Sequence, residues 1–309
     1  MGVVWKAQDE VLPRLVAVKV VGGARRADPV AVKRFRREAI AMANVAHPNV
    51  ASVYDVGQQD DQWFLVMELL TGPSVARMVA EQGMLPIAQT VRMGSQVARG
   101  LSAAHAIGIT HRDIKPGNVV LHGQVAKIVD FGIARLEAQS AQALTSPAMA
   151  IGTAAYMSPE QARGKLVQPS SDIYSLACLL TTMLTGKPPF VDPDPIEVAR
   201  AHAVDVAQPI AARRPEIPGE LNDLVAAMLV KRPSDRPTAT QVAAALGRVE
   251  SQLLGLVEPG SPNSELLAPA PASPVPPRTP RAPGPDSQPT PVLPPDPGPE
   301  RRRFWPWSR

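Results

Sequence analysis

The chain has 309 residues, 45% of them hydrophobic, and a formal net charge of +4 at pH 7. That length allows one large domain or two small ones with a substantial core. The small net charge gives no argument for a nucleic-acid partner. The single cysteine excludes a disulfide framework and fits a reducing cytosol, and no apolar run reaches the roughly 18 residues of a membrane-spanning helix.

Composition divides the chain into two parts. Of the 35 prolines, 17 lie in residues 259–309, where the hydrophobic residues follow no helical or strand period. Such a segment cannot bury enough surface to offset the entropy lost on ordering it. We therefore expect a folded domain over residues 1–255 and a disordered or polyproline-like tail over residues 256–309.

The first predicted elements are two strands. Val3, Val4 and Trp5 are consecutive apolar residues followed by polar ones, which is typical of a strand that enters a turn. The run LVAVKVV at residues 15–21 is rich in β-branched residues and contains one lysine, Lys19.

A helix is predicted next, and it contains a misplaced charge. Asp28 suits the N-cap, Pro29 suits the first helical position, and the helix should end before Pro48. Glu38 falls inside the apolar stripe of this helix, where an unpaired carboxylate is costly. Lys19 is the nearest basic candidate on an inward strand, and the arginines on the flank of the same helix are the alternative partners.

Two stretches farther along the chain carry reactive groups. Residues 110–121 read THRDIKPGNVVL and residues 127–132 read KIVDFG, with the short hairpin turn HGQ between them. The loops of these stretches contain Asp113, Lys115, Asn118 and Asp130. Hard oxygen ligands can hold Mg²⁺, a carboxylate can take a hydroxyl proton, and a cation can neutralise a moving phosphoryl group. One hairpin would bring the two loops side by side, so the pattern indicates phosphoryl transfer.

These motifs, in this order, resemble those of the eukaryotic-type bacterial serine/threonine protein kinases, and in particular the receptor-type family with a proline-rich linker next to the membrane. The resemblance extends from Gly2 to about residue 250. It rests on VAVK at 16–19, Glu38, MELL at 67–70, HRDIKPGN at 111–118, DFG at 130–132, GTAAYMSPE at 152–160, SDIYSLA at 171–177 and Arg236. It implies an α+β, two-lobed protein kinase fold, with a small, truncated β-rich lobe over about residues 1–70 and a large helical lobe over about residues 71–255.

The resemblance implies ATP and Mg²⁺ (or Mn²⁺) as cofactors and assigns residues to them. Lys19 should hold the α- and β-phosphates, with Glu38 fixing its ammonium group. Asp130 should bind one metal ion and Asn118 the second. The resemblance thus favours the Lys19–Glu38 pair over the flanking arginines.

Two residues of the loop at 111–118 are expected to act on the acceptor. By the resemblance, Asp113 orients the acceptor hydroxyl and takes its proton, and Lys115 neutralises the γ-phosphoryl group. A lysine at this position is similar to the serine/threonine kinases rather than the tyrosine kinases. Protein hydroxyl groups are therefore the implied acceptors.

The adenine base is expected against the segment MELL. Met67 resembles the gatekeeper residue, and Glu68 and Leu70 would offer backbone groups to the base. Three apolar residues would enclose the ring: Val4, Ala17 and Val120. Plain core packing is the alternative for the apolar residues, and both can hold because a purine would complete that core.

Residues 132–157 contain small and polar residues without a period, which predicts a loop. The resemblance makes it an activation loop, with Thr145 and Ser146 as candidate phosphate acceptors and Arg112 as a partner for the phosphate. An unmodified polar loop is the alternative. Thr153 is expected to hydrogen-bond the residues of the catalytic loop rather than to accept phosphate.

Two structural features of the large lobe are also predicted. Glu160 should form a salt bridge with Arg236. The run SDIYSLACLLTTMLTG is apolar nearly all round, which predicts a buried central helix with Cys178 in the core.

Both ends of the chain raise questions. Of the glycine-rich loop G-x-G-x-x-G-x-V, only the third glycine and the valine have counterparts, Gly2 and Val4. We expect a misplaced start or a truncated chain, and a natural short form with weak nucleotide binding is the alternative.

At the other end, RRRFWPWSR combines arginines with aromatic residues, which is typical of a segment beside a membrane. A basic soluble tail is the alternative.

The sequence therefore predicts a cytoplasmic serine/threonine protein kinase, located at the inner face of the cell membrane if its basic end binds lipid. The expected partners are protein substrates and a second copy of the chain, for self-phosphorylation as a homodimer, with no nucleic acid. A kinase-fold scaffold that binds partners through the proline-rich tail is the alternative. A small-molecule phosphotransferase is a weaker one, because GTAAYMSPE resembles a peptide-docking loop.

Overall fold

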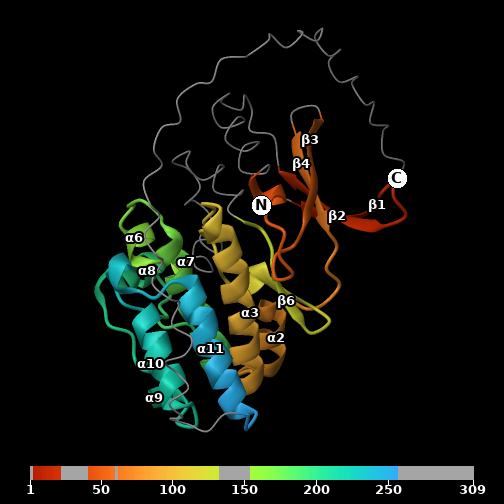
Figure 1. Ribbon diagram of the computed structural model, residues 1–309. Helices are drawn as coiled ribbons and strands as arrows, with labels where there is room; N and C mark the ends of the chain where they lie inside the picture. Colours follow the sequence, from red (N-terminus) through yellow and green to blue (C-terminus); the bar gives the residue numbers. More distant parts are fainter. Residues whose placement is uncertain (1–2, 22–40, 60–61, 132–153, 257–309) are drawn as a thin grey trace, which may run out of the picture. The chain divides into compact units, whose positions relative to one another are not determined.

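The computed structural model describes residues 3–21, 41–59, 62–131 and 154–256. The chain divides into two units, Met1–Ser261 and Pro262–Arg309, and every described residue belongs to the first. This first unit contains a four-stranded sheet and a larger set of helices (Figure 1). The predicted α+β class, with a small β-rich part and a large helical part, is confirmed.

The sheet contains strands β1 (Val3–Gln8), β2 (Leu15–Val21), β3 (Val53–Gln59) and β4 (Gln62–Glu68), paired antiparallel in the order β1-β2-β4-β3. Val4 lies opposite Lys19, and Ala17 lies opposite Met67. Side chains alternate along a strand, and opposite residues share a face. Val4, Ala17, Lys19 and Met67 therefore all lie on one face of the sheet.

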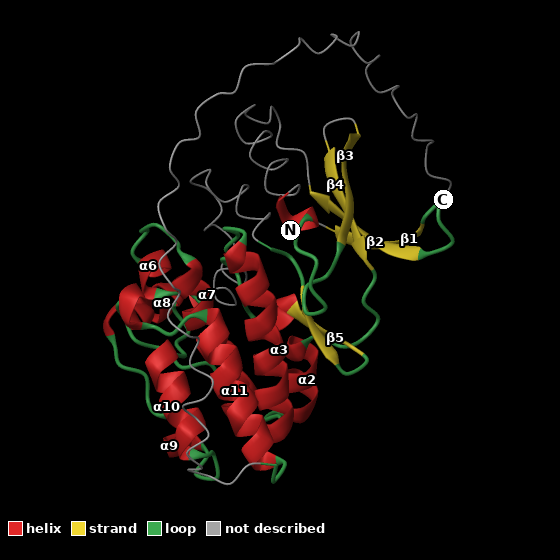
Figure 2. Cartoon of the chain, viewed as in Figure 1, coloured by secondary structure: helices red, strands yellow, loops and turns green. Residues whose placement is uncertain are grey.

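A second, two-stranded sheet is the hairpin expected between the two reactive loops. It consists of β5 (Val119–His122) and β6 (Val125–Ile128), and Val119 lies opposite Ile128. Gly123 at the turn has φ 61°, a left-handed conformation that favours glycine. The hairpin lies beside α3 (Ile87–Ala106) (Figure 2).

The predicted central helix is α7 (Pro169–Thr185), and its residues 171–184 are all buried. Pro169 occupies the first turn, where its missing N–H costs nothing. The helix ends at Gly186, whose φ of 75° is the left-handed conformation of a C-cap. Cys178 is fully buried, as predicted.

The other helices surround α7. They are α2 (Val75–Gln82), α3, α6 (Pro159–Ala162), α8 (Pro195–Val204), α9 (Ile210–Arg213), α10 (Gly219–Met228) and α11 (Ala239–Leu253), together with the short 3₁₀ helices Pro116–Asn118 and Pro233–Asp235. α3 packs against both α7 and α11. Gly94 permits this close approach, because a Cβ atom there would lie 2.6 Å from a methyl group of Leu180.

The helix predicted to end before Pro48 is described only at its end. Residues 41–43 are helical, and Met42 and Val45 are buried as the apolar stripe predicts. Asp28 and Glu38 lie outside the described residues. No helix in the described part of the chain is both long and apolar enough to cross a membrane.

Candidate active site

Three of the residues expected to take part in catalysis, Asp113, Lys115 and Asn118, lie together in the segment before β5. The Asp113 Oδ2 atom lies 2.8 Å from Lys115 Nζ and 3.0 Å from Asn118 Nδ2. The Asn118 amide also donates to the Asp113 backbone carbonyl at 2.8 Å. A carboxylate held between a cation and an amide is fixed in orientation, which suits a group that receives a proton.

The hairpin brings the second reactive loop to the first. Val129, directly after β6, donates its N–H to the carbonyl oxygen of Asn118 at 3.0 Å. Asp130 follows with φ 60°, an uncommon conformation for a residue other than glycine. The spacing of Asp113 and Asp130 in the sequence is thus converted into two adjacent loops, as predicted.

Lys19 reaches this second loop from the sheet. Its Nζ atom lies 2.8 Å from Asp130 Oδ1, and the Lys19 residue is only 8% exposed. The expected partner Glu38 lies outside the described residues, so that pairing stays a prediction. Sequence reasoning did not foresee the contact between Lys19 and Asp130.

The donors fit the metal ions that the family implies. Asp130 offers a carboxylate and Asn118 an amide oxygen, which are hard ligands suited to Mg²⁺ or Mn²⁺. In the described ranges, no group of three or more His, Cys, Asp or Glu side chains gathers in a way that could hold a metal by protein ligands alone.

Three of the residues expected at the adenine base, Val4, Ala17 and Met67, lie on the same face of the sheet as Lys19. Ala17 and Met67 are buried, while Val4 is 54% exposed. Glu68 donates its N–H to Ser52 O at 2.9 Å, so the backbone group that it can offer to a base is its carbonyl oxygen. Leu70, Val120 and Glu68 are partly buried, and Gly2 lies outside the described residues.

An ion pair that sequence reasoning missed adjoins this region. The Glu68 carboxylate lies 2.9 Å from Lys127 Nζ and also accepts from Ser52 N at 3.2 Å. Both charged side chains are largely buried. The pair joins the end of β4 to the hairpin that carries Val120, which lies opposite Lys127 in the register.

The carboxylate of Asp172 in α7 binds the backbone of the loop that carries Asp113. This carboxylate accepts from the backbone N–H of His111 at 2.8 Å and of Arg112 at 2.7 Å, and lies 2.8 Å from the His105 Nε2 atom. Asp172 is 1% exposed, and the Arg112 that it holds has φ 70°. A buried carboxylate in the first turn of an otherwise apolar helix was the available sequence signal for this residue.

His111 links the two reactive loops. Its Nδ1 atom accepts from the N–H of Asp113 at 3.2 Å, so Nε2 carries the proton and donates to the Val129 carbonyl at 2.9 Å. The ring also packs on Phe131, with the centroids 4.5 Å apart. A fully buried side chain therefore couples the loop of Asp113 to the loop of Asp130.

The predicted salt bridge between Glu160 and Arg236 is confirmed. Arg236 Nη1 and Nη2 donate to the two oxygens of Glu160 at 2.8 and 2.9 Å, and both side chains are buried. Burial raises the pKa of Glu160, but the hydrogen bonds from Arg236 and Ser171 outweigh it and hold the pKa below its usual range. The carboxylate is therefore ionised at neutral pH.

α7 and α8 support the segment 154–158 that precedes α6. Ser175 donates to the Tyr156 carbonyl at 2.7 Å. Tyr174, His202 and Lys231 form a buried cluster beneath, with the Tyr174 hydroxyl 3.0 Å from His202 Nδ1. Burial, assisted by Lys231, lowers the pKa of His202 to about 4, so this imidazole is neutral. The predicted activation-loop residues Thr145, Ser146 and Thr153 lie outside the described residues.

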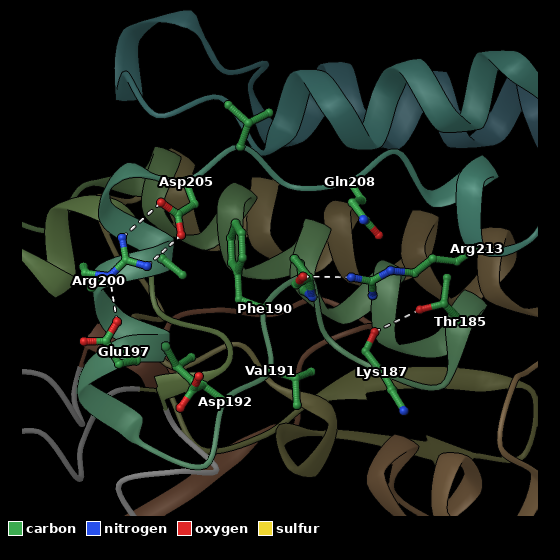
Figure 3. Close-up of a pocket in the computed structure, with 14 residues that line it drawn as sticks. Thr185, Lys187, Phe190, Val191, Asp192, Glu197, Arg200, Asp205, Gln208 and Arg213 are labelled. Carbon is green, nitrogen blue, oxygen red and sulfur yellow. Dashed lines mark hydrogen bonds and ion pairs between the residues drawn. The ribbon is translucent and has the colours of Figure 1, made fainter.

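The clearest hollows in the described part of the chain lie away from these groups. One, of about 580 Å³, lies beside α8, where Arg200 bridges Glu197 and Asp205 (Figure 3). Another, of about 740 Å³, lies between the start of α7 and the loop before α11. Neither is lined by Lys19 or Asp113.

Comparisons with known proteins agree with the geometry. The model of the protein kinase domain family matches residues 1–245. The chain is 39% identical to a probable serine/threonine-protein kinase of Clostridium perfringens and 40% identical to the serine/threonine-protein kinase PknB of Mycobacterium leprae, in each case over 81% of its length. It spans 36% and 41% of those two relatives.

A solved structure shows the same fold. The kinase domain of PknI from Mycobacterium tuberculosis superposes with a TM-score of 0.63 at 29% identity, covering 80% of this chain and 91% of that one. The family match extends over most of the chain, and the grouped residues Lys19, Asp113, Asn118 and Asp130 have the chemistry that it requires. The chain therefore belongs to the protein kinase domain family and resembles its bacterial serine/threonine members.

Proposed function

We propose that this chain transfers the γ-phosphoryl group of ATP to serine and threonine hydroxyls of proteins. The observation that carries the proposal is the grouping of Asp113, Lys115 and Asn118 beside Asp130 and Lys19. Phosphoryl transfer needs little covalent help from an enzyme, because positioning and charge stabilisation supply most of the catalysis. The site provides both.

Asp113 orients the acceptor hydroxyl and takes its proton as the new oxygen–phosphorus bond forms. The bond between the γ-phosphorus and the bridging oxygen breaks, and that oxygen leaves with ADP. Lys115, 2.8 Å from the Asp113 carboxylate, neutralises charge on the transferred group. Bound Mg²⁺ or Mn²⁺ would supply positive charge to the phosphates; Asp130 would hold one ion and Asn118 the second.

Lys19 is proposed to exchange Asp130 for the phosphates of the nucleotide when the nucleotide binds. Its ammonium group neutralises Asp130 in the structure. The phosphates of a bound nucleotide would offer Lys19 a new anionic partner, and Asp130 would then be available to hold a metal ion. Glu38 is proposed to stabilise Lys19 in that arrangement. Met67, Glu68, Leu70, Val4, Ala17 and Val120 are proposed to hold the adenine base, with Gly2 near the phosphates.

The test is transfer of labelled phosphate from ATP to a generic basic protein and to the chain itself, with Mg²⁺ or Mn²⁺. Asp113→Asn is the control, because it keeps the size of the side chain and removes the proton acceptor. Transfer by the wild type alone supports the proposal. A version extended upstream by a strand and glycine loop is assayed in parallel. If no form transfers phosphate, the result would favour a scaffold that binds partners through the proline-rich tail.

We also propose that phosphorylation of Thr145 or Ser146 activates the enzyme, by transfer between two copies of the chain. Arg112 lies next to Asp113, where it can pair with such a phosphate. Mass spectrometry of the self-reacted protein would locate the modified residues. A double variant, Thr145→Ala with Ser146→Ala, should react more slowly with a peptide substrate, and equal rates would contradict the proposal.

A membrane location is proposed from composition. RRRFWPWSR unites four arginines, three of them consecutive, with aromatic residues, and each basic residue near an anionic lipid surface is worth about 1 kcal/mol. This proposal places the kinase at the inner face of the cell membrane. The full chain should sediment with phosphatidylserine vesicles, while a variant with the arginines at 301–303 changed to serine should not. Equal sedimentation of both would argue against it.

A further inference from the structure

Gln161 of α6 joins two segments that the reaction needs together. Its Oε1 atom accepts from the N–H of Ser158 at 2.9 Å, which completes a capping box at the start of α6. Its Nε2 atom donates to the carbonyl oxygen of Arg112 at 2.8 Å. The opposite orientation of the amide would set oxygen against oxygen and N–H against N–H, so the two partners fix this one.

The carbonyl that Gln161 binds belongs to a constrained peptide. Arg112 has φ 70°, and a residue other than glycine keeps this conformation only where its surroundings hold it. Asp172 holds the N–H of Arg112 at 2.7 Å. The following peptide group is held at both edges, by Gln161 at its oxygen and by His111 Nδ1 at the N–H of Asp113.

We propose that Gln161 is a positioning residue that couples the segment 154–160, which resembles a peptide-docking loop, to the catalytic loop. Rotation of the peptide between Arg112 and Asp113 would move the carboxylate that takes the acceptor proton. Gln161 opposes that rotation from the element that follows the docking segment. The proposal rests on the kinase function proposed above and assigns a further residue to it.

The coupling between the docking segment and the catalytic loop depends on how firmly α6 is anchored. Glu160, next to Gln161, is anchored to the large lobe by Arg236, and Ser158 is fully buried. α6 is therefore a fixed platform at the end of the docking segment. The hydrogen bond from the Gln161 side-chain amide fixes the peptide before Asp113 relative to α6. The docking segment and the residue that takes the acceptor proton are therefore held in place by the same helix.

Two variants separate this role from capping. Gln161→Glu keeps the oxygen that accepts from Ser158 but sets a carboxylate oxygen against the Arg112 carbonyl. Gln161→Met keeps the length of the side chain and loses both bonds. Gln241→Glu is the matched control, because Gln241 forms the same capping box with Thr238 at the start of α11.

Phosphorylation of a peptide substrate is the first measurement. We expect Gln161→Glu and Gln161→Met to lower kcat roughly tenfold, on the scale of one lost hydrogen bond to a constrained carbonyl. The KM for ATP should change little, since Lys19 and Asp130 are not touched. Gln241→Glu should match the wild type. A wild-type kcat for Gln161→Glu, with a lower melting temperature for Gln161→Met alone, would show that Gln161 is only a cap and overturn the proposal.

The pH dependence gives a signature that a structural role would not produce. A protonated carboxyl can donate to the Arg112 carbonyl as the native amide does, so the deficit of Gln161→Glu relative to wild type should shrink as the pH falls from about 7 toward the ordinary glutamate pKa of about 4.3. The deficit of Gln161→Met should stay constant over that range. Parallel profiles for both variants would count against the proposed hydrogen bond.

Amide hydrogen exchange tests the coupling without catalysis. Residues 111–114 should exchange faster in Gln161→Glu than in the wild type or in Gln241→Glu. Equal exchange in all three proteins overturns the proposal, whether or not the wild type transfers phosphate. An inactive wild-type chain with faster exchange in Gln161→Glu would instead retain the coupling and reject the proposed activity.

Discussion

Replacement of Arg236 tests how burial determines the contribution of an ion pair to the free energy of unfolding. Its guanidinium donates to both oxygens of Glu160 at 2.8 and 2.9 Å, and also to the backbone carbonyls of Val230, Ser170 and Lys231. The Arg236 side chain is 0% exposed and that of Glu160 6% exposed. Replacing Arg236 with alanine leaves a buried carboxylate and three carbonyl groups without this donor.

The size of the effect follows from that burial. Removing one partner of a buried, hydrogen-bonded ion pair typically costs about 3–5 kcal/mol. In a domain of this size, each kcal/mol shifts the melting temperature by roughly 2–4 °C. We therefore expect Arg236→Ala to melt roughly 6–20 °C below the wild type.

Arg200 is the matched control, because its guanidinium group also donates hydrogen bonds to carboxylates through several nitrogen atoms. It donates to Glu197 at 2.7 Å and to both oxygens of Asp205 at 3.1 and 3.0 Å (Figure 3). All three side chains are about half exposed, so water replaces the lost partner. Arg200→Ala should shift the melting temperature by no more than about 3 °C.

The assay is thermal unfolding of the two variants and the wild type, followed by circular dichroism in the same buffer. Added salt should change the small effect of Arg200→Ala and leave the large effect of Arg236→Ala nearly intact, because buried charges are screened less. Equal shifts for the two variants would falsify the reasoning that burial, rather than the number of bonds, sets the cost.

Three further predictions follow from the geometry. The lowered pKa of Glu160 means that this residue stabilises the fold above its ordinary value of 4.5 and loses that contribution as the pH falls through the folded value; the gap in melting temperature between wild type and Glu160→Gln should narrow below pH 4.5, and a widening gap would contradict the sign. Lys127→Met leaves the largely buried Glu68 carboxylate without its ammonium partner beside the adenine site, so the KM for ATP should rise several-fold with little change in kcat; a loss confined to kcat in steady-state assays would count against this role. Gly94 and Gly247, both within helices, should respond oppositely to alanine in urea unfolding: Gly94→Ala should destabilise, because its Cβ would meet a leucine methyl group at 2.6 Å, while Gly247→Ala, with nothing within 4 Å, should stabilise by about 0.5–1 kcal/mol.

Local patterns were enough for much of the fold. The β-branched residues of 15–21 predicted β2, and the all-round apolar run after Asp172 predicted the buried α7. The short spacing between the two reactive loops predicted the hairpin β5–β6. These features follow from residues close in sequence, because side-chain periodicity and turn chemistry act over a few residues.

The partners of the charged groups were harder to predict. The sequence favoured Glu38 for Lys19, and the structure shows Asp130 in contact with Lys19 while Glu38 lies outside the described residues. Lys127 was read only as part of a motif, yet it binds Glu68 across 59 positions of the chain. A charged side chain has several possible partners, and only the packing of distant elements selects one.

The sequence by itself determined which residues could perform phosphoryl transfer, since their types, order and spacing are constrained together by the chemistry. Only the tertiary structure decided what holds them. Asp172 lies 60 positions after Arg112, and Gln161 lies 49 positions after it, yet both bind its backbone. Neither contact has a periodic signature, because a hydrogen bond to a backbone group depends on where the chain passes in space and not on the residue type that it meets there.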